Sequence, residues 1–237
     1  MIDLHTVLPA LLTADTAAPR LTYYDDATGE RVEFSAKVLA NWTAKAANFL
    51  VEEAEAGLST TVGLVLPTHW RAMYWALASW SVGATVVVGS DAPEAEVVVT
   101  DDADIAAAAV RSGRYAVLVT LAALARSRPD TPAGATDEAR ELASYGDVFA
   151  PIDRPAASSA ALRWEDGEAA YRTTTAALVT STPLAPGTRV RVPDDLSAAL
   201  RTAIAAWHGG GSIVIVRNAL SDQAHRLAAE RVTLDLG

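Results

Sequence analysis

The sequence predicts an α/β protein built from two related, mostly parallel sheets with flanking helices. Short apolar, β-branched runs alternate along the chain with segments whose apolar residues recur at helical spacing. Several of these runs lack the inside–outside alternation of a half-exposed strand, which is typical of strands buried on both faces of a parallel sheet. The pattern of apolar runs, turns and helices in the last third of the chain is also similar to that in the first third. Such similarity predicts a repeated structural unit.

The stretch from Thr61 to Gly89 shows this pattern most clearly. Residues 62–66 form a short apolar run, and the proline after them stops a strand. A helix follows, and Gly83 ends it before a second buried run at 84–88. The apolar stripe of this helix consists of Trp70, Met73, Tyr74 and Leu77. Strand, crossover helix and strand together predict a right-handed βαβ unit.

The same signals define the elements on either side. Upstream, an acidic turn that ends in Gly29 joins two strands into a hairpin, and Ser35 caps the next helix, which Gly57 ends. Downstream, apolar runs alternate with one more helix. The expected ranges are a helix at 2–14, strands at 21–24, 31–34, 96–100 and 115–120, and a helix at 105–111.

The composition changes between Ser127 and Ser159. Four prolines and many small polar residues there leave room only for a short helix at 136–144. This segment is the expected boundary. We therefore predict a first lobe over residues 1–126, a connection over 127–159, and a second, shorter lobe of the same domain over 160–237.

The second lobe repeats the first. Residues 161–167 match the strand and acidic turn of the first hairpin, and 189–193 match 63–67. A helix at 196–207 then leads through glycines into an apolar run at 212–216. From the strand-ending proline to the glycine after the helix is 16 residues in both copies, 67 to 83 and 193 to 209. Two copies of one unit predict two similar sheets.

The composition excludes some classes of function. The formal net charge is −10 and no cluster of Lys and Arg opposes it, so we expect no nucleic-acid partner. The chain has no cysteine and no basic N-terminal start, so the cytoplasm is the expected compartment. Residues 72–90 carry no charge, but Gly83 and the β-branched run after it favour a buried helix and strand over a membrane span.

Framework residues of both copies form a known arrangement: a strand pair, a helix, a strand ending in Leu-Pro, and a helix closing on Gly-Ala before another strand. They are Leu21–Tyr23, Phe34-Ser35, Val62–Pro67, Trp70, Ala76–Trp80, Gly83–Val88 and Leu184–Val190. Over residues 20–217 the chain thus resembles the N-terminal domain of the AMP-dependent synthetase and ligase superfamily, which includes the acyl-CoA synthetases, and within it a group of short actinobacterial chains. The resemblance implies the two-sheet fold.

The resemblance also implies catalytic parts from which this chain departs. The family's loop T-S-G-T-T-G-x-P-K-G, which wraps the phosphates of ATP, corresponds to residues 156–168, with one glycine, no lysine and added acid. Tyr145-Gly146-Asp147 is similar to the start of the family's Y-G-x-T-E motif, but it precedes that loop and lacks Thr-Glu, so we treat it as coincidence. No lysine follows Lys45, so the family's lid lysine has no counterpart. We expect a truncated relative with no catalytic residue and no cofactor.

Four residues are the ligand-binding candidates. His69 stands at a helix N-terminus, where the dipole favours neutral imidazole. Asp101 and Asp102 follow a strand, and open α/β sheets bind ligands beyond strand ends, although capping of the next helix also explains such residues. His208 begins a His-Gly-Gly-Gly run similar to the oxyanion strip of lipases, but no G-x-S-x-G elbow occurs and a helix C-cap explains the glycines. We expect no metal site.

Three hypotheses about function follow. The first is a non-catalytic scaffold that binds a small acyl or nucleotide-like ligand, or a protein partner. The alternative is a fragment of an AMP-dependent ligase that another chain completes. The third is an oligomerisation module, in which a homodimer covers an open sheet edge. The sequence does not name the ligand.

Overall fold

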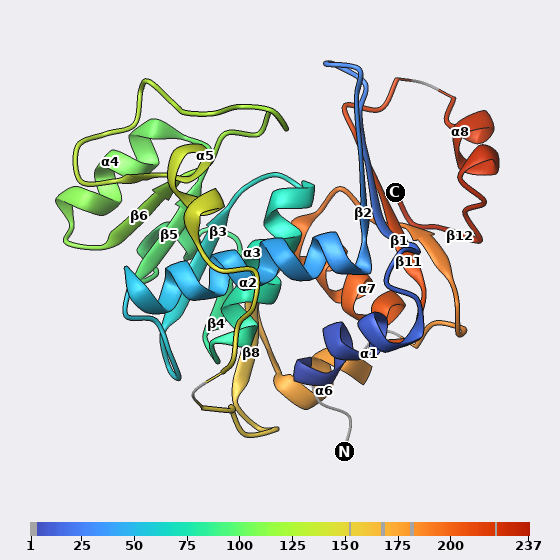
Figure 1. Cartoon of the computed structure of the whole chain (residues 1–237), viewed down its shortest axis with the longest axis horizontal. Coiled ribbons are helices and arrows are strands. Elements are labelled where there is room, and N and C mark those ends of the chain that lie inside the picture. The colour runs from blue at the N-terminus through green and yellow to red at the C-terminus, as the bar shows by residue number, and fades with distance from the viewer. Residues whose placement is uncertain (1–3, 152, 167–168, 181–182, 221) are drawn as a thin grey trace. The chain divides into compact units, whose positions relative to one another are not determined.

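The computed structural model describes residues 4–151, 153–166, 169–180, 183–220 and 222–237. Within them the chain alternates strands and helices, as the sequence predicts (Figure 1). The strands are β1 (Pro19–Asp25), β2 (Glu30–Ser35), β3 (Thr61–Val65), β4 (Thr85–Val87), β5 (Val97–Thr100), β6 (Tyr115–Leu118), β7 (Thr136–Asp137), β8 (Ala160–Asp166), β9 (Ala169–Thr174), β10 (Arg189–Arg191), β11 (Ser212–Arg217) and β12 (Leu234–Asp235).

The helices lie between these strands. They are α1 (Val7–Ala14), α2 (Ala36–Glu52), α3 (Trp70–Ser81), α4 (Ala103–Arg111), α5 (Glu138–Glu141), α6 (Thr175–Thr180), α7 (Leu196–His208) and α8 (Ala224–Ala229), with 3-10 turns η1 (Leu4–Thr6), η2 (Ala92–Glu94) and η3 (Leu142–Ser144). The Ser35 hydroxyl accepts the Val38 N–H at 3.3 Å, which is the cap expected at the start of α2.

The chain divides into two compact units. Unit 1 comprises residues 1–40, 67–73 and 176–237, and unit 2 comprises residues 41–66 and 74–175. Each unit contains one sheet. This division follows the sheets. The lobes expected at 1–126 and 160–237 stay a prediction.

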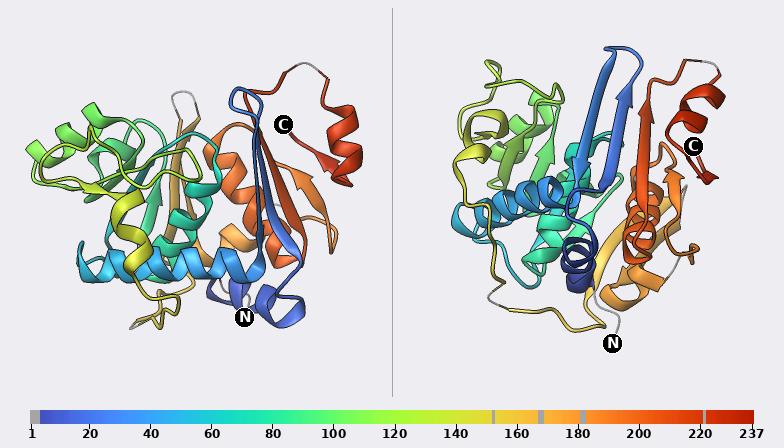
Figure 2. Two further views of the ribbon diagram at one scale, coloured as in Figure 1. Left: turned by 45° about the horizontal axis from the view of Figure 1, so that its top comes forward. Right: turned by 45° about the vertical axis from the view of Figure 1, so that its right-hand side comes forward.

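The sheet of unit 1 has the strand order β12-β10-β11-β1-β2, parallel except for β2. Leu21 pairs with Ile213 and Tyr23 with Ile215, and all four side chains are buried. The helix α7 packs on β10 and β11, and α1 packs on α7 (Figure 2). Trp207, the largest buried residue of α7, donates its indole N–H to the carbonyl of Arg20 at 2.9 Å.

The sheet of unit 2 has the order β7-β6-β5-β3-β4-β8-β9, parallel except for β9. Its middle strands carry the apolar runs seen in the sequence, and α4 covers β5 and β6. Gly63 lies in β3, where a Cβ would come within 1.8 Å of the Ala92 carbonyl oxygen. Glycine is therefore required at this position for β3 to pass η2.

A buried carboxylate ties α5 to α3 within unit 2. Glu138, 2% exposed, accepts hydrogen bonds from the Tyr74 hydroxyl and, at 3.3 Å, from the Trp75 indole N–H. Because the donors and the acceptor are all buried, these two hydrogen bonds fix α5 against α3.

The repeat explains why the units interleave along the chain. The hairpin β1–β2 of the first copy joins β11 of the second copy, and the hairpin β8–β9 of the second copy joins β4 of the first. Both junctions are parallel, and they use equivalent positions: Leu21 pairs with Ile213, and Leu162 pairs with Val86. Each sheet thus combines the hairpin of one copy with the βαβ unit of the other.

In the part of the chain that the structure describes, we find no helix that combines the length and the apolar character needed to cross a membrane. The uncharged stretch 72–90 consists of most of α3, a turn at Gly83, and β4 with the residues after it.

Candidate functional site

His69 precedes α3 and is fully buried in unit 1. Its ring lies edge-on to Tyr23, with centroids 4.5 Å apart, and 5.2 Å from the ring of Trp70. The Nδ1 atom accepts the Arg71 backbone N–H at 3.1 Å, so the proton of the neutral ring is on Nε2. That buried Nε2 has no hydrogen-bond partner in the structure.

Burial strongly disfavours a charge on His69. It lowers the pKa of His69 to about 3, and the positive charges of Arg71 and Arg217 act in the same direction, while the negative charge of Asp25 opposes them. Protonation would also break the bond that Nδ1 accepts. His69 is therefore a neutral, packed side chain above pH 4, and burial, not the helix dipole considered in the sequence, is the main cause.

Asp25, at the end of β1, is the charged neighbour of this cluster. Its carboxylate accepts from the Asn218 amide at 2.8 Å, the Ala27 N–H at 2.9 Å and the Tyr23 hydroxyl at 3.2 Å. Burial alone would raise the pKa of Asp25, but these hydrogen bonds and the charge of Arg217 outweigh it and lower the pKa. The carboxylate thus stays ionised and its bonds join the ends of β1 and β11.

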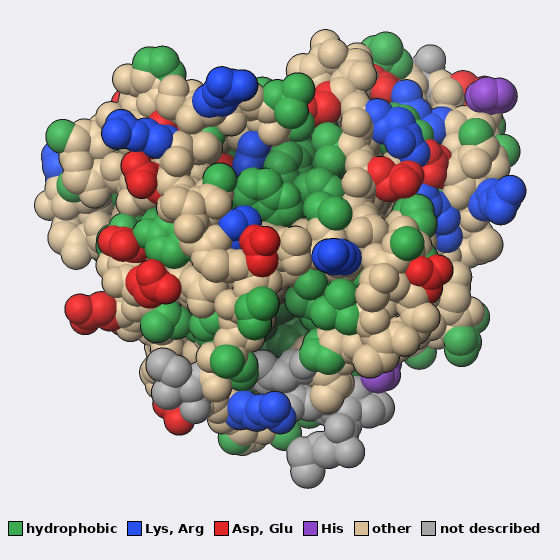
Figure 3. Space-filling view, in the orientation of Figure 1, with side chains coloured by type: hydrophobic (Ala, Val, Ile, Leu, Met, Phe, Trp, Pro, Cys, Tyr) green, Lys and Arg blue, Asp and Glu red, His purple; other side chains and the backbone are tan. Residues whose placement is uncertain are grey.

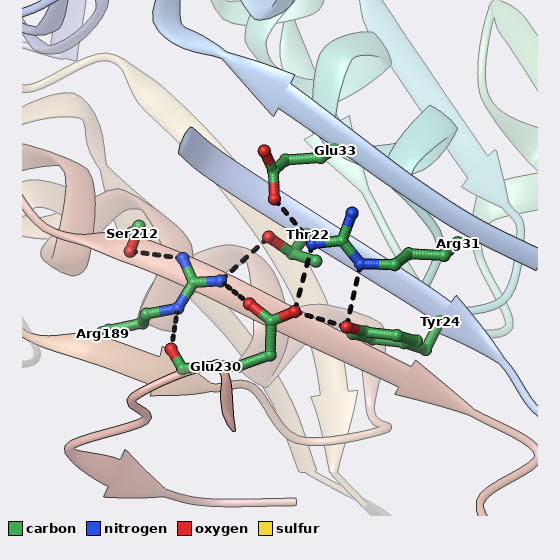
Figure 4. A network of polar contacts seen from close by, with 7 residues as sticks. All are labelled: Thr22, Tyr24, Arg31, Glu33, Arg189, Ser212 and Glu230. Atoms are coloured by element: carbon green, nitrogen blue, oxygen red, sulfur yellow. Dashed lines mark hydrogen bonds and ion pairs between the residues drawn. The ribbon is translucent and has the colours of Figure 1, made fainter. Parts of the chain in front are cut away.

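A second polar network joins strands of the sheet of unit 1 to the end of α8 (Figure 4). Arg189 donates to the hydroxyls of Ser212 and Thr22 at 3.0 and 2.9 Å, and pairs with Glu230 at the end of α8. Tyr24 donates to the same carboxylate, which Arg31 also approaches at 3.2 Å. Basic and acidic side chains accordingly alternate on the surface between β2 and α8 (Figure 3). These charges satisfy one another within the chain.

Unit 2 contains an open pocket of about 650 Å³. Phe49, Tyr115 and Tyr145 line it, together with the proline-rich segment 127–137 and Arg140. The ring of Phe49 lies edge-on to Tyr115 at 5.8 Å and to Tyr145 at 5.4 Å. We call this space the aromatic pocket. Its volume is within the range of small-molecule sites, roughly 300–1,000 Å³.

The helix α2 positions one wall of the aromatic pocket. Lys45 donates to the carbonyls of Ala143 and Tyr145 at 3.0 and 2.5 Å and pairs with Asp147 at 2.8 Å. Asn48 holds the next residues through two more carbonyls at 3.0 Å. Burial raises the pKa of Tyr145, as does the hydrogen bond that its hydroxyl donates to Glu53, so the phenol stays protonated.

The two arginines of the pocket differ in their availability. Arg128 is occupied, because it donates to the carbonyls of Asp101 and Val119 at 2.7 and 2.8 Å and pairs with Asp130 at 3.0 Å. Arg140 is 74% exposed and, among the described residues, its one salt bridge is a 3.4 Å contact with the neighbouring Glu141. Such an exposed pair contributes little, so Arg140 is available to an anionic ligand.

The four candidate residues fall in two different units. His69 and His208 belong to unit 1, and Asp101 and Asp102 belong to unit 2. Asp102 caps α4, accepting the N–H groups of Asp104 and Ile105 at 2.8 and 3.2 Å. The Asp101 backbone carbonyl accepts a hydrogen bond from Arg128, which lines the aromatic pocket.

His208 is exposed at the last position of α7. The glycines after it form the helix end: the Gly210 N–H donates to Trp207 and the Gly211 N–H to Ala206, at 2.9 and 2.7 Å. Gly210 has φ +71°, and a Cβ on Gly211 would lie 2.1 Å from the Thr188 carbonyl oxygen. A helix C-cap therefore accounts for the glycine run, as the sequence indicates.

Sequence reasoning missed the aromatic pocket. Tyr145 belongs to the motif match that the sequence presents as a coincidence, and Phe49 is not among the candidate residues. A usable signal was Lys45, one of only two lysines in the chain, because so rare a residue raises the question of which groups its amine binds.

The interval matched to the family's phosphate loop is the turn into β8 and the strand itself. It forms a hairpin with β9, and its tip, residues 167–168, lies outside the described residues. The hairpin contains no lysine. Over the described ranges, the structure contains no group of three or more His, Asp or Glu side chains arranged to hold a metal ion.

The fold matches known structures over its whole length. The N-terminal domain of FACL13 from Mycobacterium tuberculosis superposes with a TM-score of 0.72 at 15% identity, covering 99% of this chain and 62% of that one. An acyl-CoA synthetase from Brucella canis gives 0.76 at 16% identity, covering 98% and 47%. MatB from Rhodopseudomonas palustris gives 0.73 at 16%, covering 99% and 49%.

This chain therefore has the fold of an acyl-CoA synthetase N-terminal domain, which confirms the resemblance and the fold class predicted from the sequence. It spans between 47% and 62% of the length of those three structures. No family model matches it. A TIGR03089 family protein from Mycobacterium tuberculosis is 37% identical over 242 residues, which cover 96% of this chain and 95% of that protein. The chain belongs to the TIGR03089 family.

Proposed function

We propose that this protein is a non-catalytic relative of the adenylate-forming enzymes that binds a small acyl compound in the aromatic pocket. The observation that carries the proposal is the pocket itself, a space of about 650 Å³ lined by Phe49, Tyr115 and Tyr145 among other residues. Three acids, Glu53, Asp137 and Glu141, also line it. Aromatic rings suit the apolar part of an acyl ligand. Arg140, at the same pocket, suits its carboxylate.

The placement of the basic residues argues against adenylation by this chain alone. Binding and transferring a nucleoside triphosphate requires cations beside the phosphates. One of the chain's two lysines, Lys45, is engaged in holding the segment around Tyr145. The hairpin β8–β9 has no lysine, and its basic residues are Arg163 and Arg172.

Calorimetric titration of the purified protein with acetate, octanoate, benzoate, AMP and Mg·ATP tests the proposal, with pyrophosphate exchange measured in parallel. We expect one carboxylic acid to bind with 1:1 stoichiometry and no exchange. Arg140→Gln is expected to weaken that binding by about tenfold, since a charge-assisted hydrogen bond is lost. Arg111→Gln, which removes an exposed arginine of α4 outside the pocket, is the matched control.

Two results would overturn the proposal. Equal binding by wild type and Arg140→Gln, with Tyr145→Ala also unaffected, would show that the ligand lies elsewhere. Pyrophosphate exchange by the protein alone would show that it is an enzyme.

A further inference from the structure

The aromatic pocket contains an acid beside its rings as well as the exposed arginine of α5. Glu53 lines the pocket directly after α2. Its N–H donates to the Phe49 carbonyl at 2.9 Å, so Glu53 continues the helix one turn beyond Phe49, on the same face. The Tyr145 hydroxyl donates to Glu53 at 2.8 Å, and the Phe49 ring packs against the Tyr145 ring. The Glu53 carboxylate therefore lies beside the aromatic rings.

The position of Glu53 is unfavourable for α2 itself. The carbonyl groups at the end of a helix carry partial negative charge, which disfavours acids and favours cations. The helix ends in Glu52, Glu53 follows it, and the last turn contains no basic residue. After burial, which is the largest cause, the hydrogen bond and the charge of Glu53 raise the pKa of Tyr145, and the charge of Glu52 adds to them. The electrostatic potential at this end of the pocket is therefore negative.

Glu53 differs from the other two acids of the pocket in its partners. Within the described part of the chain, no salt bridge includes Glu53, and its hydrogen bond comes from the neutral Tyr145 hydroxyl. Asp137 caps α5 by accepting the Arg140 N–H at 3.4 Å, and Glu141 pairs with the Arg140 guanidinium at 3.4 Å. Glu53 is therefore the acid with which a cation of the ligand can pair.

We propose that the ligand of the aromatic pocket is an amino acid that carries its ammonium group at the end opposite its carboxylate. This inference rests on the acyl function proposed above. Arg140 binds the carboxylate, Glu53 accepts a hydrogen bond from the ammonium, and the rings contact the methylene chain between them. The ring faces also stabilise an ammonium group that lies beside them. Since Arg140 and Glu53 form no salt bridge with each other, a ligand meets both only if its two charges are apart.

Calorimetric titration with compounds that share a six-carbon chain tests the inference: hexanoate, hexylamine, 6-aminohexanoate and norleucine. We expect 6-aminohexanoate to bind about tenfold more tightly than hexanoate, because one charge-assisted hydrogen bond is gained. Norleucine carries both charges at one end, and hexylamine has no carboxylate. Each of these two should bind at least about tenfold more weakly than 6-aminohexanoate, because each loses one of the two charged contacts.

Two variants separate the ammonium contact from the rest of the pocket. Glu53→Gln should abolish the preference for 6-aminohexanoate over hexanoate and retain the binding of hexanoate. Glu55→Gln is the matched control, because it removes a nearby exposed acid that does not line the pocket, and it should keep the preference. Both substitutions replace exposed side chains, so both variants should fold, and Glu53→Gln should slightly raise the melting temperature by removing an acid from a helix end.

The outcomes distinguish this inference from the proposed function. Hexanoate binding to wild type as tightly as 6-aminohexanoate would overturn the inference and leave the acyl function standing, as would a preference that survives in Glu53→Gln. Equal binding of norleucine would show that the ligand's charges lie together, which also overturns it. Hexylamine binding equal to that of 6-aminohexanoate would overturn both proposals. Absence of binding by all four compounds would overturn the inference, and the acyl function as well if octanoate and benzoate also fail to bind.

Discussion

Replacing His69 should remove a defined part of the protein's loss of stability in acid. The pKa of His69 is about 3 in the folded protein and near 6.5 when unfolded, so the unfolded state binds the proton more readily. Stability from this group is complete above pH 6.5 and is lost as the pH falls toward 3. Each pH unit below 6.5 costs up to about 1.4 kcal/mol, so at pH 5 the loss is about 2 kcal/mol.

The assay is urea unfolding at pH 8 and pH 5, followed by tryptophan fluorescence, to which Trp70 beside His69 contributes. Wild type should lose about 2 kcal/mol more than His69→Gln and His69→Phe between the two pH values. Carboxylates and the other histidines contribute alike to all three proteins and cancel. His208→Gln, which removes an exposed imidazole, should behave as wild type. A loss in the two His69 variants within about 0.5 kcal/mol of wild type would refute the reasoning.

Three further substitutions test the framework by urea unfolding and hydrogen exchange. Glu138→Ala should cost about 3 kcal/mol, because it removes two buried hydrogen bonds to a charged group, and Glu138→Gln should recover part of that loss. Gly63→Ala should cost about 3 kcal/mol, because the added Cβ would clash with the Ala92 backbone. Gly57→Ala, whose Cβ would meet nothing within 4 Å, should change stability by less than about 0.5 kcal/mol. Equal effects of the two substitutions would show that β3 does not pass close to η2. Glu230→Ala should cost about 2 kcal/mol and speed amide exchange throughout α8; unchanged exchange there would show that the network does not hold this helix.

Local structure was predictable from the sequence because local signals determine it. The apolar run at 62–66 lies within one residue of β3, and α3 begins at Trp70, the first residue of the predicted stripe. The cap residue Asp102 holds the first N–H groups of α4, and Asp195 holds that of Ala198 in α7. In each case the residue that begins or ends an element lies within a few positions of the backbone groups that it affects.

The exchange of hairpins between sheets was not predictable in the same way. The turn and the apolar pattern of a hairpin such as β8–β9 are local in the sequence. Its pairing with β4, however, depends on a strand about 75 residues away in sequence. The aromatic pocket has the same origin. Phe49, Tyr115 and Tyr145 come from three separate segments, and no spacing rule relates them.

The two copies of the repeat differ in the polar groups that surround their hairpins. In unit 1 the charged groups near the hairpin satisfy one another: Asp25 with Asn218, Asp26 with Arg226, and Arg189 with Glu230. Networks closed in this way rigidify a fold and leave few charges for a ligand. In unit 2 the sheet edge beyond β6 opens into the aromatic pocket. The proposed acyl site lies in unit 2, so substitutions within the networks of unit 1 should change stability and leave acyl binding intact.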